Sequence, residues 1–174
     1  PGIEVDMVGE GADDLPRDGK HLVAKSMMMA FERMGEKPAG LSILTNNTIP
    51  HARGMGSSSA AIVGGIVLAR ALVVGGDNLL PDAAVLSLAS EIEGHPDNVA
   101  AALYGGFTLA WGMGADAQAV RLDIDRSIFP IVCIPAAAVA TKKARGLLPE
   151  TVSHADAAFN AGRSALLTAA MCEN

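Results

Sequence analysis

The spacing of apolar residues predicts alternating strands and helices in the first part of the chain. Apolar and polar positions alternate over residues 3–8, which is typical of a strand with one buried face. Apolar residues recur at helical spacing over 20–34, and Asp18 is the expected N-cap of that helix. Residues 57–74 are apolar on almost every side, so we expect a helix buried all round, with two adjacent glycines packed closely against a sheet.

The remaining pattern predicts further elements in an irregular order. The expected strands are 41–47, 107–111, 119–124 and 128–134. The expected helices are 81–93, 97–103 and 155–173, with a helical turn at 142–148. Because this order is not a regular alternation of strand and helix, it predicts an α+β two-layer fold rather than a doubly wound sheet.

Composition and charge narrow the class of protein. The 174 residues are 50% hydrophobic and carry a formal net charge of −6. Such a chain can form a core, and its acidic balance argues against nucleic acid or an anionic membrane as partner. No apolar stretch reaches the roughly 20 residues that span a bilayer, and Cys133 and Cys172 have neither metal-site nor disulfide-framework spacing. We therefore expect a cytoplasmic protein.

Both ends of the chain fall within predicted elements. The first residue is not methionine, and a strand is already under way at residues 3–8. The last helix, 155–173, is followed by nothing that could bury it. We therefore expect a piece of a longer enzyme.

A glycine-rich loop leads directly into the long apolar helix. The unpaired N–H groups and the dipole at a helix start attract anions, and Gly54 and Gly56 let a ligand approach the backbone closely. Three serines, Ser57 to Ser59, add hydroxyl groups for phosphate or a metal ion, which indicates a phosphate-binding loop. The lysine of a Walker A loop is missing, and a serine-capped buried helix fits the same residues. A hydrolase nucleophile elbow with Asp125 and His154 is less favoured, because no strand leads directly into the serines.

Two further stretches carry candidate chemistry. Glu93 and Asp97 bracket a tight turn, and Asn98 follows; carboxylate oxygens suit a divalent metal, although helix capping is the alternative. Thr141 and Arg145 lie four residues apart and would share a helix face, where an arginine can bind a carboxylate bidentately. A solvated basic turn is the alternative there.

Together, the three stretches resemble the motifs of one family. Residues 50–60 closely resemble the ATP-binding signature of the GHMP kinases. The run Glu93-Gly94-His95-Pro96-Asp97-Asn98-Val99-Ala100, and Thr141-x-x-x-Arg145-x-x-Leu148-Pro149, resemble the homoserine kinase branch of that family. Met55 stands where leucine is usual, and Ser59 where alanine is commoner. The family's N-terminal Asn/Asp motif and C-terminal glycine-rich motif are not in this chain, so the resemblance covers the central part.

The resemblance implies a fold and an activity. It implies an incomplete GHMP-kinase-type ATP-binding domain over 1–125 and the start of a second, ferredoxin-like α+β domain over 126–174. The implied reaction is ATP-dependent phosphorylation of the L-homoserine hydroxyl in threonine biosynthesis, with this chain inactive by itself. The alternatives are another GHMP kinase of the mevalonate or sugar type, or an inactive nucleotide-binding fragment. A homodimer is compatible with this interpretation.

The resemblance also assigns roles to residues. Ser58 and Glu93 would ligate Mg²⁺. Asp97 and Asn98 would lie at the homoserine and γ-phosphate site and, with Glu93, form the catalytic group. Thr141 and Arg145 would hold the substrate, with Arg145 on its carboxylate. Asp97 would act either as a base or through positioning and charge stabilisation. The residues expected to bind ATP are Pro50, Arg53, Gly54, Met55, Gly56, Ser57, Ser58, Ser59 and Ala60.

Overall fold

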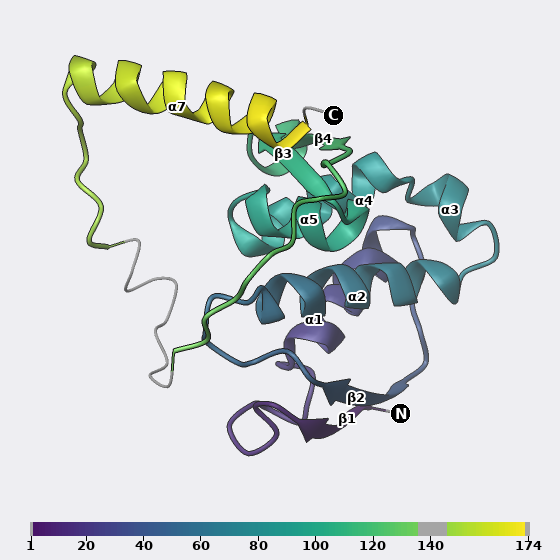
Figure 1. Cartoon of the computed structure of the whole chain (residues 1–174). Coiled ribbons are helices and arrows are strands. Elements are labelled where there is room, and N and C mark those ends of the chain that lie inside the picture. Colours follow the sequence, from purple (N-terminus) through teal and green to yellow (C-terminus); the bar gives the residue numbers. More distant parts are fainter. Residues whose placement is uncertain (1, 136–145, 173–174) are drawn as a thin grey trace.

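Two small sheets enclose a group of helices. The computed structural model describes residues 2–135 and 146–172. In chain order its elements are β1 (Ile3–Gly9), α1 (Leu22–Arg33), β2 (Leu41–Asn47), α2 (Ser57–Ala71), α3 (Gly76–Leu79), α4 (Asp82–Glu93), α5 (Asp97–Tyr104), β3 (Phe107–Trp111), the 3-10 turn η1 (Gly114–Asp116), β4 (Gln118–Leu122) and α7 (His154–Cys172). Figure 1 shows α1, α2, α4 and α5 between β1–β2 on one side and β3–β4 on the other. The predicted mixture of helices and strands is confirmed.

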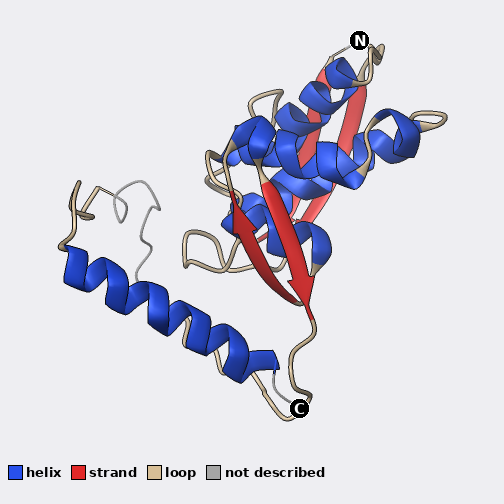
Figure 2. Ribbon diagram, turned by 90° about the horizontal axis from the view of Figure 1, so that it is seen from above, coloured by secondary structure: helices blue, strands red, loops and turns tan. Residues whose placement is uncertain are grey.

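The strands pair as two ribbons. β1 and β2 are parallel, with Ile3 opposite Leu41, and β3 and β4 are antiparallel, with Phe107 opposite Leu122. Seen from above, β3 and β4 lie in front of the helices (Figure 2). The predicted alternation in β1 is confirmed, because its inward residue Val5 is 5% exposed while its neighbours face solvent.

The hydrophobic core lies between the helices and the first ribbon. Its fully buried side chains include Met27 of α1, Ile66 of α2, Leu86 of α4 and Val99 of α5. Burial of one such side chain stabilises the fold by about 1.5–3 kcal/mol. Within the described residues, Ala117 is the one buried apolar residue that follows Ala100. The core is therefore built almost wholly from the chain up to α5.

Helix α1 begins later than the sequence predicts. Its N-cap is His21, whose Nδ1 accepts a hydrogen bond from the backbone N–H of Val23 at 3.3 Å. Asp18, the predicted N-cap, accepts a hydrogen bond from the backbone N–H of Lys20 at 2.8 Å in the preceding turn. The prediction was wrong because tertiary packing buries His21, which is 4% exposed, against the helix start.

The prediction that α2 is buried all round is also wrong. Ile66 lies on its buried face, but Gly64 is exposed and Leu68 is 45% exposed. A Cβ atom at Gly65 would lie 2.6 Å from the carbonyl oxygen of Val23 in α1. The close approach is therefore between two helices rather than between a helix and a sheet. An apolar sequence alone does not show how many faces have a partner.

The last third of the described chain departs most from the sequence prediction. Residues 128–134 form no strand in the described structure, and Phe129 and Ile131 are 80% and 92% exposed. The predicted turn at 142–148 falls partly outside the described residues. The predicted C-terminal helix is confirmed as α7, which is exposed along most of its length. Helix α3 was not predicted. None of the described helices is long and apolar enough to cross a membrane.

Candidate active site

The glycine-rich loop connects the end of β2 to the start of α2. Gly54 and Gly56 have φ values of +74° and +77°, a left-handed conformation that favours glycine. Gly56 is the N-cap of α2, and no side chain caps this helix start. A Cβ atom at either glycine would meet nothing within 4 Å. The loop therefore presents its backbone to open space at the positive end of a partly buried helix.

The first turn of α2 faces the last residue of α4. The hydroxyl groups of Ser58 and Ser59 both donate hydrogen bonds to Oε1 of Glu93, at 2.9 and 3.2 Å. Gly94, in the left-handed conformation at φ +89°, ends α4 and turns the chain away immediately after this carboxylate. The structure thus brings together the serine and carboxylate oxygens that were expected to share a cation.

Asn98 and Asp97, the first two residues of α5, have different surroundings. Asn98 lines a cavity of about 270 Å³ together with Glu93 and the glycine-rich loop. The carboxylate of Asp97 pairs with Nδ1 of His95 and also accepts a hydrogen bond from the backbone N–H of Asn98 at 2.7 Å. Asn98 is therefore placed at the loop, whereas Asp97 is held by the turn that precedes α5.

A cationic side chain of the loop has an unused donor. Arg53 also lines the 270 Å³ cavity, and its Nη1 is buried without a hydrogen-bond partner among the described residues. A buried guanidinium N–H without a partner is costly, so it marks a place for an acceptor oxygen. Arg53 therefore brings a positive charge to the cavity that the carboxylate of Glu93 also lines.

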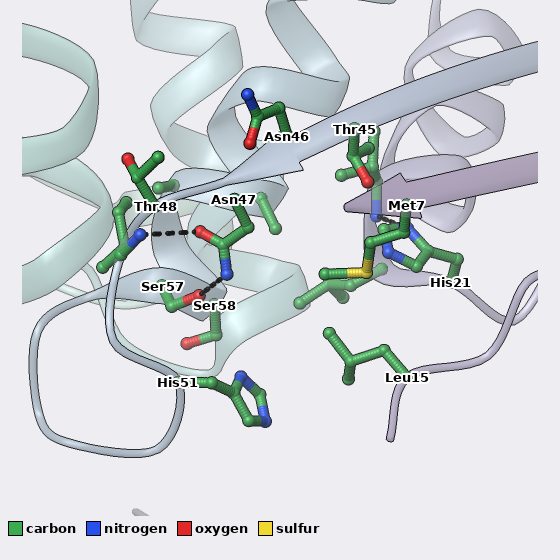
Figure 3. A pocket seen from close by; sticks show the side chains of 15 residues that line it. Met7, Leu15, His21, Thr45, Asn46, Asn47, Thr48, His51, Ser57 and Ser58 are labelled. Carbon is green, nitrogen blue, oxygen red and sulfur yellow. Dashed lines mark hydrogen bonds between the residues drawn. The ribbon is translucent and has the colours of Figure 1, made fainter. Parts of the chain in front are cut away.

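A second cavity adjoins the loop from the other side. It has a volume of about 310 Å³ and shares His51, Ser57 and Ser58 with the first cavity. Its wall continues over β1, α1 and β2 and is largely apolar, with Met7, Leu15 and Leu22 among the lining residues. Figure 3 shows the side chains that line it. The two cavities have residues in common at the start of α2.

Asn47 holds the loop in place, and the sequence analysis missed it. Its amide nitrogen donates hydrogen bonds to Oγ of Ser57 at 3.2 Å and to the carbonyl oxygen of Glu10 at 2.9 Å. Its Oδ1 accepts a hydrogen bond from the backbone N–H of Ile49 at 3.0 Å (Figure 3). An asparagine at the end of a strand before a glycine-rich loop is the only sequence signal for this role.

His21 is a further residue that the sequence analysis left aside. It lines the larger cavity, and burial lowers the pKa of its imidazole below the ordinary value. Its Nε2 is buried without a hydrogen-bond partner among the described residues. Because Nδ1 accepts the hydrogen bond of Val23, the neutral ring is the form that caps α1.

Other expected residues are not brought into this site. Thr141 and Arg145 lie outside the described residues. The hydrolase alternative is not supported, because β2 ends at Asn47 and residues 48–56 separate it from the serines. No group of three or more His, Cys, Asp or Glu side chains that could hold a metal occurs in the described part of the chain.

The comparisons agree with this geometry. Residues 21–106, which include the glycine-rich loop, match a family model, GHMP kinases N terminal domain. This part of the chain is therefore a GHMP kinase N-terminal domain. Within that family, its relatives include homoserine kinases of Streptomyces avermitilis and Mycobacterium tuberculosis.

The extent of these matches is also informative. The Streptomyces avermitilis protein is 57% identical over 170 residues, which are 98% of this chain and 56% of that protein. The Mycobacterium tuberculosis protein is 42% identical over 177 residues, covering 99% of this chain and 56% of that protein. A crystal structure of homoserine kinase from Cytophaga hutchinsonii superposes with a TM-score of 0.76 at 26% identity, covering 98% of this chain and 55% of that one. The chain thus spans little more than half the length of these relatives.

Proposed function

We propose that this chain carries the nucleotide-binding part of an ATP-dependent kinase that phosphorylates the hydroxyl of L-homoserine. One observation carries this proposal. The start of α2 has no side-chain cap, and Ser58 in its first turn donates a hydrogen bond to the carboxylate of Glu93 at 2.9 Å. The names of the relatives support homoserine as the acceptor. Because the chain spans about 56% of the first of these relatives, we propose phosphoryl transfer for the longer polypeptide and nucleotide binding for this chain.

The loop residues suit the phosphates of ATP. The first backbone N–H groups of a helix have no partner within the helix, and its dipole favours negative charge there, so the uncapped start of α2 suits phosphate. The unpartnered Nη1 of Arg53 supplies a further donor to an anionic oxygen. The adjoining apolar cavity of about 310 Å³ suits the uncharged nucleoside end of the same molecule.

The fit to Mg²⁺ rests on the donor set. Mg²⁺ prefers oxygen ligands and commonly takes one or two from the protein while phosphates and water supply the rest. The hydroxyl of Ser58 and the carboxylate of Glu93 provide two such oxygens on one side of the loop. A bound Mg²⁺ would neutralise phosphate charge during transfer. Without it, the serine hydroxyl groups hold the Glu93 carboxylate in position.

The acceptor would lie near Asn98, with the reaction driven by positioning and charge stabilisation. Asn98 lines the same cavity as Glu93, so its amide is placed to orient a hydroxyl group. The pairing of Asp97 with His95 favours a structural role for Asp97 over direct proton removal. We assign substrate binding to Thr141 and Arg145 on the resemblance alone.

The proposal also covers the domain boundary within the chain and the cellular location of the protein. We propose a domain boundary close to residue 125, because all buried apolar residues of the described chain precede it and β4 ends at Leu122. We also propose a cytoplasmic location, since the implied reaction draws on cellular ATP and Cys133 and Cys172 are free thiols.

Nucleotide binding is tested on this chain by titration calorimetry with ATP and Mg²⁺. Ser58→Ala and Glu93→Gln should each weaken Mg²⁺-dependent ATP binding by tenfold or more, because each removes an oxygen from the metal position. Glu91→Gln is the matched control, since Glu91 lies on the same helix but pairs with Arg33 at 2.8 Å. Unchanged Mg²⁺-dependent affinity in both site variants would refute the metal assignment.

The acceptor is tested in a chimera in which this chain replaces its matched region in the Streptomyces avermitilis protein. We expect ATP-dependent phosphorylation of L-homoserine, measured by product formation, and none of mevalonate or galactose. Transfer to mevalonate or galactose in preference to homoserine would show that the family is right and the substrate wrong.

A further inference from the structure

The two faces of the β3–β4 ribbon carry side chains of different kinds. Ala110 and Ala119, which are opposite each other in the register, pack against the hydrophobic core. Side chains alternate between the two faces of a strand, so the neighbours of these alanines point away from the core. The register places six residues, five of them apolar, on that second face, here called the outer face: Phe107, Leu109, Trp111, Gln118, Val120 and Leu122.

The outer face is mostly apolar and is open to solvent. Leu109, Val120 and Trp111 are 36%, 41% and 51% exposed. An antiparallel ribbon with one solvated face normally carries polar residues there. Here Ala110 and Ala119 pack against the core, while five large apolar side chains lie on the outer face. Contiguous exposed apolar side chains mark a surface that another element covers.

The open apolar surface continues along the chain after β4. Phe129 and Ile131 are largely exposed, and α7 exposes Phe159 and Leu166. The carbonyl oxygen of Met171 accepts a hydrogen bond from the backbone N–H of Asp125 at 3.0 Å, yet α7 leaves the outer face uncovered. Figure 2 shows α7 running apart from β3 and β4 over most of its length. The described chain therefore holds no cover for this face.

We propose that the outer face is the docking surface for the part of the homologous polypeptide that lies outside this chain. The 170 matched residues are 56% of the Streptomyces avermitilis protein, so more than two fifths of that protein is available as cover. Five partly exposed side chains offer far less than the roughly 800 Å² per partner of a stable dimer. A segment of the same polypeptide docks on a small face because it loses little translational and rotational freedom.

The single tryptophan of the chain, Trp111, reports directly on this face. We compare acrylamide quenching of its fluorescence in this chain and in the Streptomyces avermitilis chimera, with the other tryptophans of the chimera replaced by phenylalanine. We expect a quenching constant several-fold lower in the chimera, with a blue-shifted emission maximum. Equal quenching in a cooperatively folded chimera overturns the proposal. A chimera that does not fold cooperatively also counts against it, because at 57% identity the outer face should fit the remainder.

Variants provide an independent measurement. Val120→Lys should lower the thermal midpoint of the chimera by roughly 4 °C or more and change that of this chain little. Val74→Lys is the matched control, because Val74 is 100% exposed and lies away from the ribbon, and it should change neither. An equal loss in both backgrounds for Val120→Lys refutes docking.

Dimerisation of this chain alone is the competing outcome. If light scattering finds a dimer and Trp111 becomes protected as concentration rises, a second copy covers the outer face and the proposal is wrong. None of these measurements uses ATP or homoserine. Failure of the docking proposal is therefore separable from failure of the proposed kinase function.

Discussion

Replacement of Gly56 by alanine should change two quantities that can be measured separately, the stability of the fold and the affinity for ATP. Gly56 has φ +77° and open space around its missing Cβ, so alanine meets no steric clash and only the backbone conformation is strained. The left-handed conformation costs a non-glycine residue about 1–2 kcal/mol. For a chain of this size, that corresponds to a loss of about 2–8 °C in thermal midpoint.

The same substitution should also weaken ATP binding, by an amount equal to or larger than its cost to the fold. A methyl group at Gly56 would project into the open space where we propose that phosphate binds the backbone at the start of α2. Loss of one hydrogen bond to a charged group costs about 1.5–3 kcal/mol, which corresponds to a roughly ten- to hundredfold loss of affinity. Titration calorimetry with ATP and Mg²⁺ measures this loss.

Gly75 provides the matched control. It is the N-cap of α3 and has φ +73°, and a Cβ atom there would also meet nothing within 4 Å, but it lies outside both cavities. Gly75→Ala should therefore lower the thermal midpoint by a similar amount and leave ATP affinity unchanged. Equal ATP affinity for the two alanine variants would show that the loop does not receive phosphate.

Two further predictions concern stability. The pKa of His21 lies below 6.5 in the folded chain, so as the pH falls His21 takes up its proton in the unfolded chain before it does so in the folded chain. The free energy of unfolding should therefore fall as the pH drops below about 6.5 and level off below the folded pKa. Urea unfolding between pH 5 and 8 should show a smaller change of this free energy with pH for His21→Asn than for the unchanged chain. The same change with pH in both proteins would contradict this prediction. Gly64→Ala should stabilise α2 by about 0.5–1 kcal/mol, because its position is open. Gly65→Ala should destabilise the fold by about 1–3 kcal/mol, because its Cβ would lie 2.6 Å from a backbone oxygen of α1. A higher thermal midpoint for Gly65→Ala than for Gly64→Ala would contradict this helix packing.

Local chemistry made much of the site predictable from the sequence. Glycine at positions 54 and 56 before three serines indicates a loop that enters a helix, whatever the remainder of the chain does. Glu93 before Gly94 indicates a helix that ends at a carboxylate. The sequence could not show that these two helix ends meet, because residues 58 and 93 are joined only by packing of α2 on α4. The 2.9 Å hydrogen bond between Ser58 and Glu93 is therefore a tertiary result.

The alternation and helical spacing of apolar residues determined where most elements lie, because each period reports which side chains can share a face. The partners of those faces were decided only in three dimensions. The apolar length of α2 did not reveal that one side is open, and the burial of His21 replaced the predicted cap of α1. Residues 128–134 have a strand-like sequence but no neighbouring strand in the described structure, since a strand requires a partner for its backbone hydrogen bonds. The local pattern thus determined most of the elements, and long-range packing decided which surfaces are buried and where the site forms.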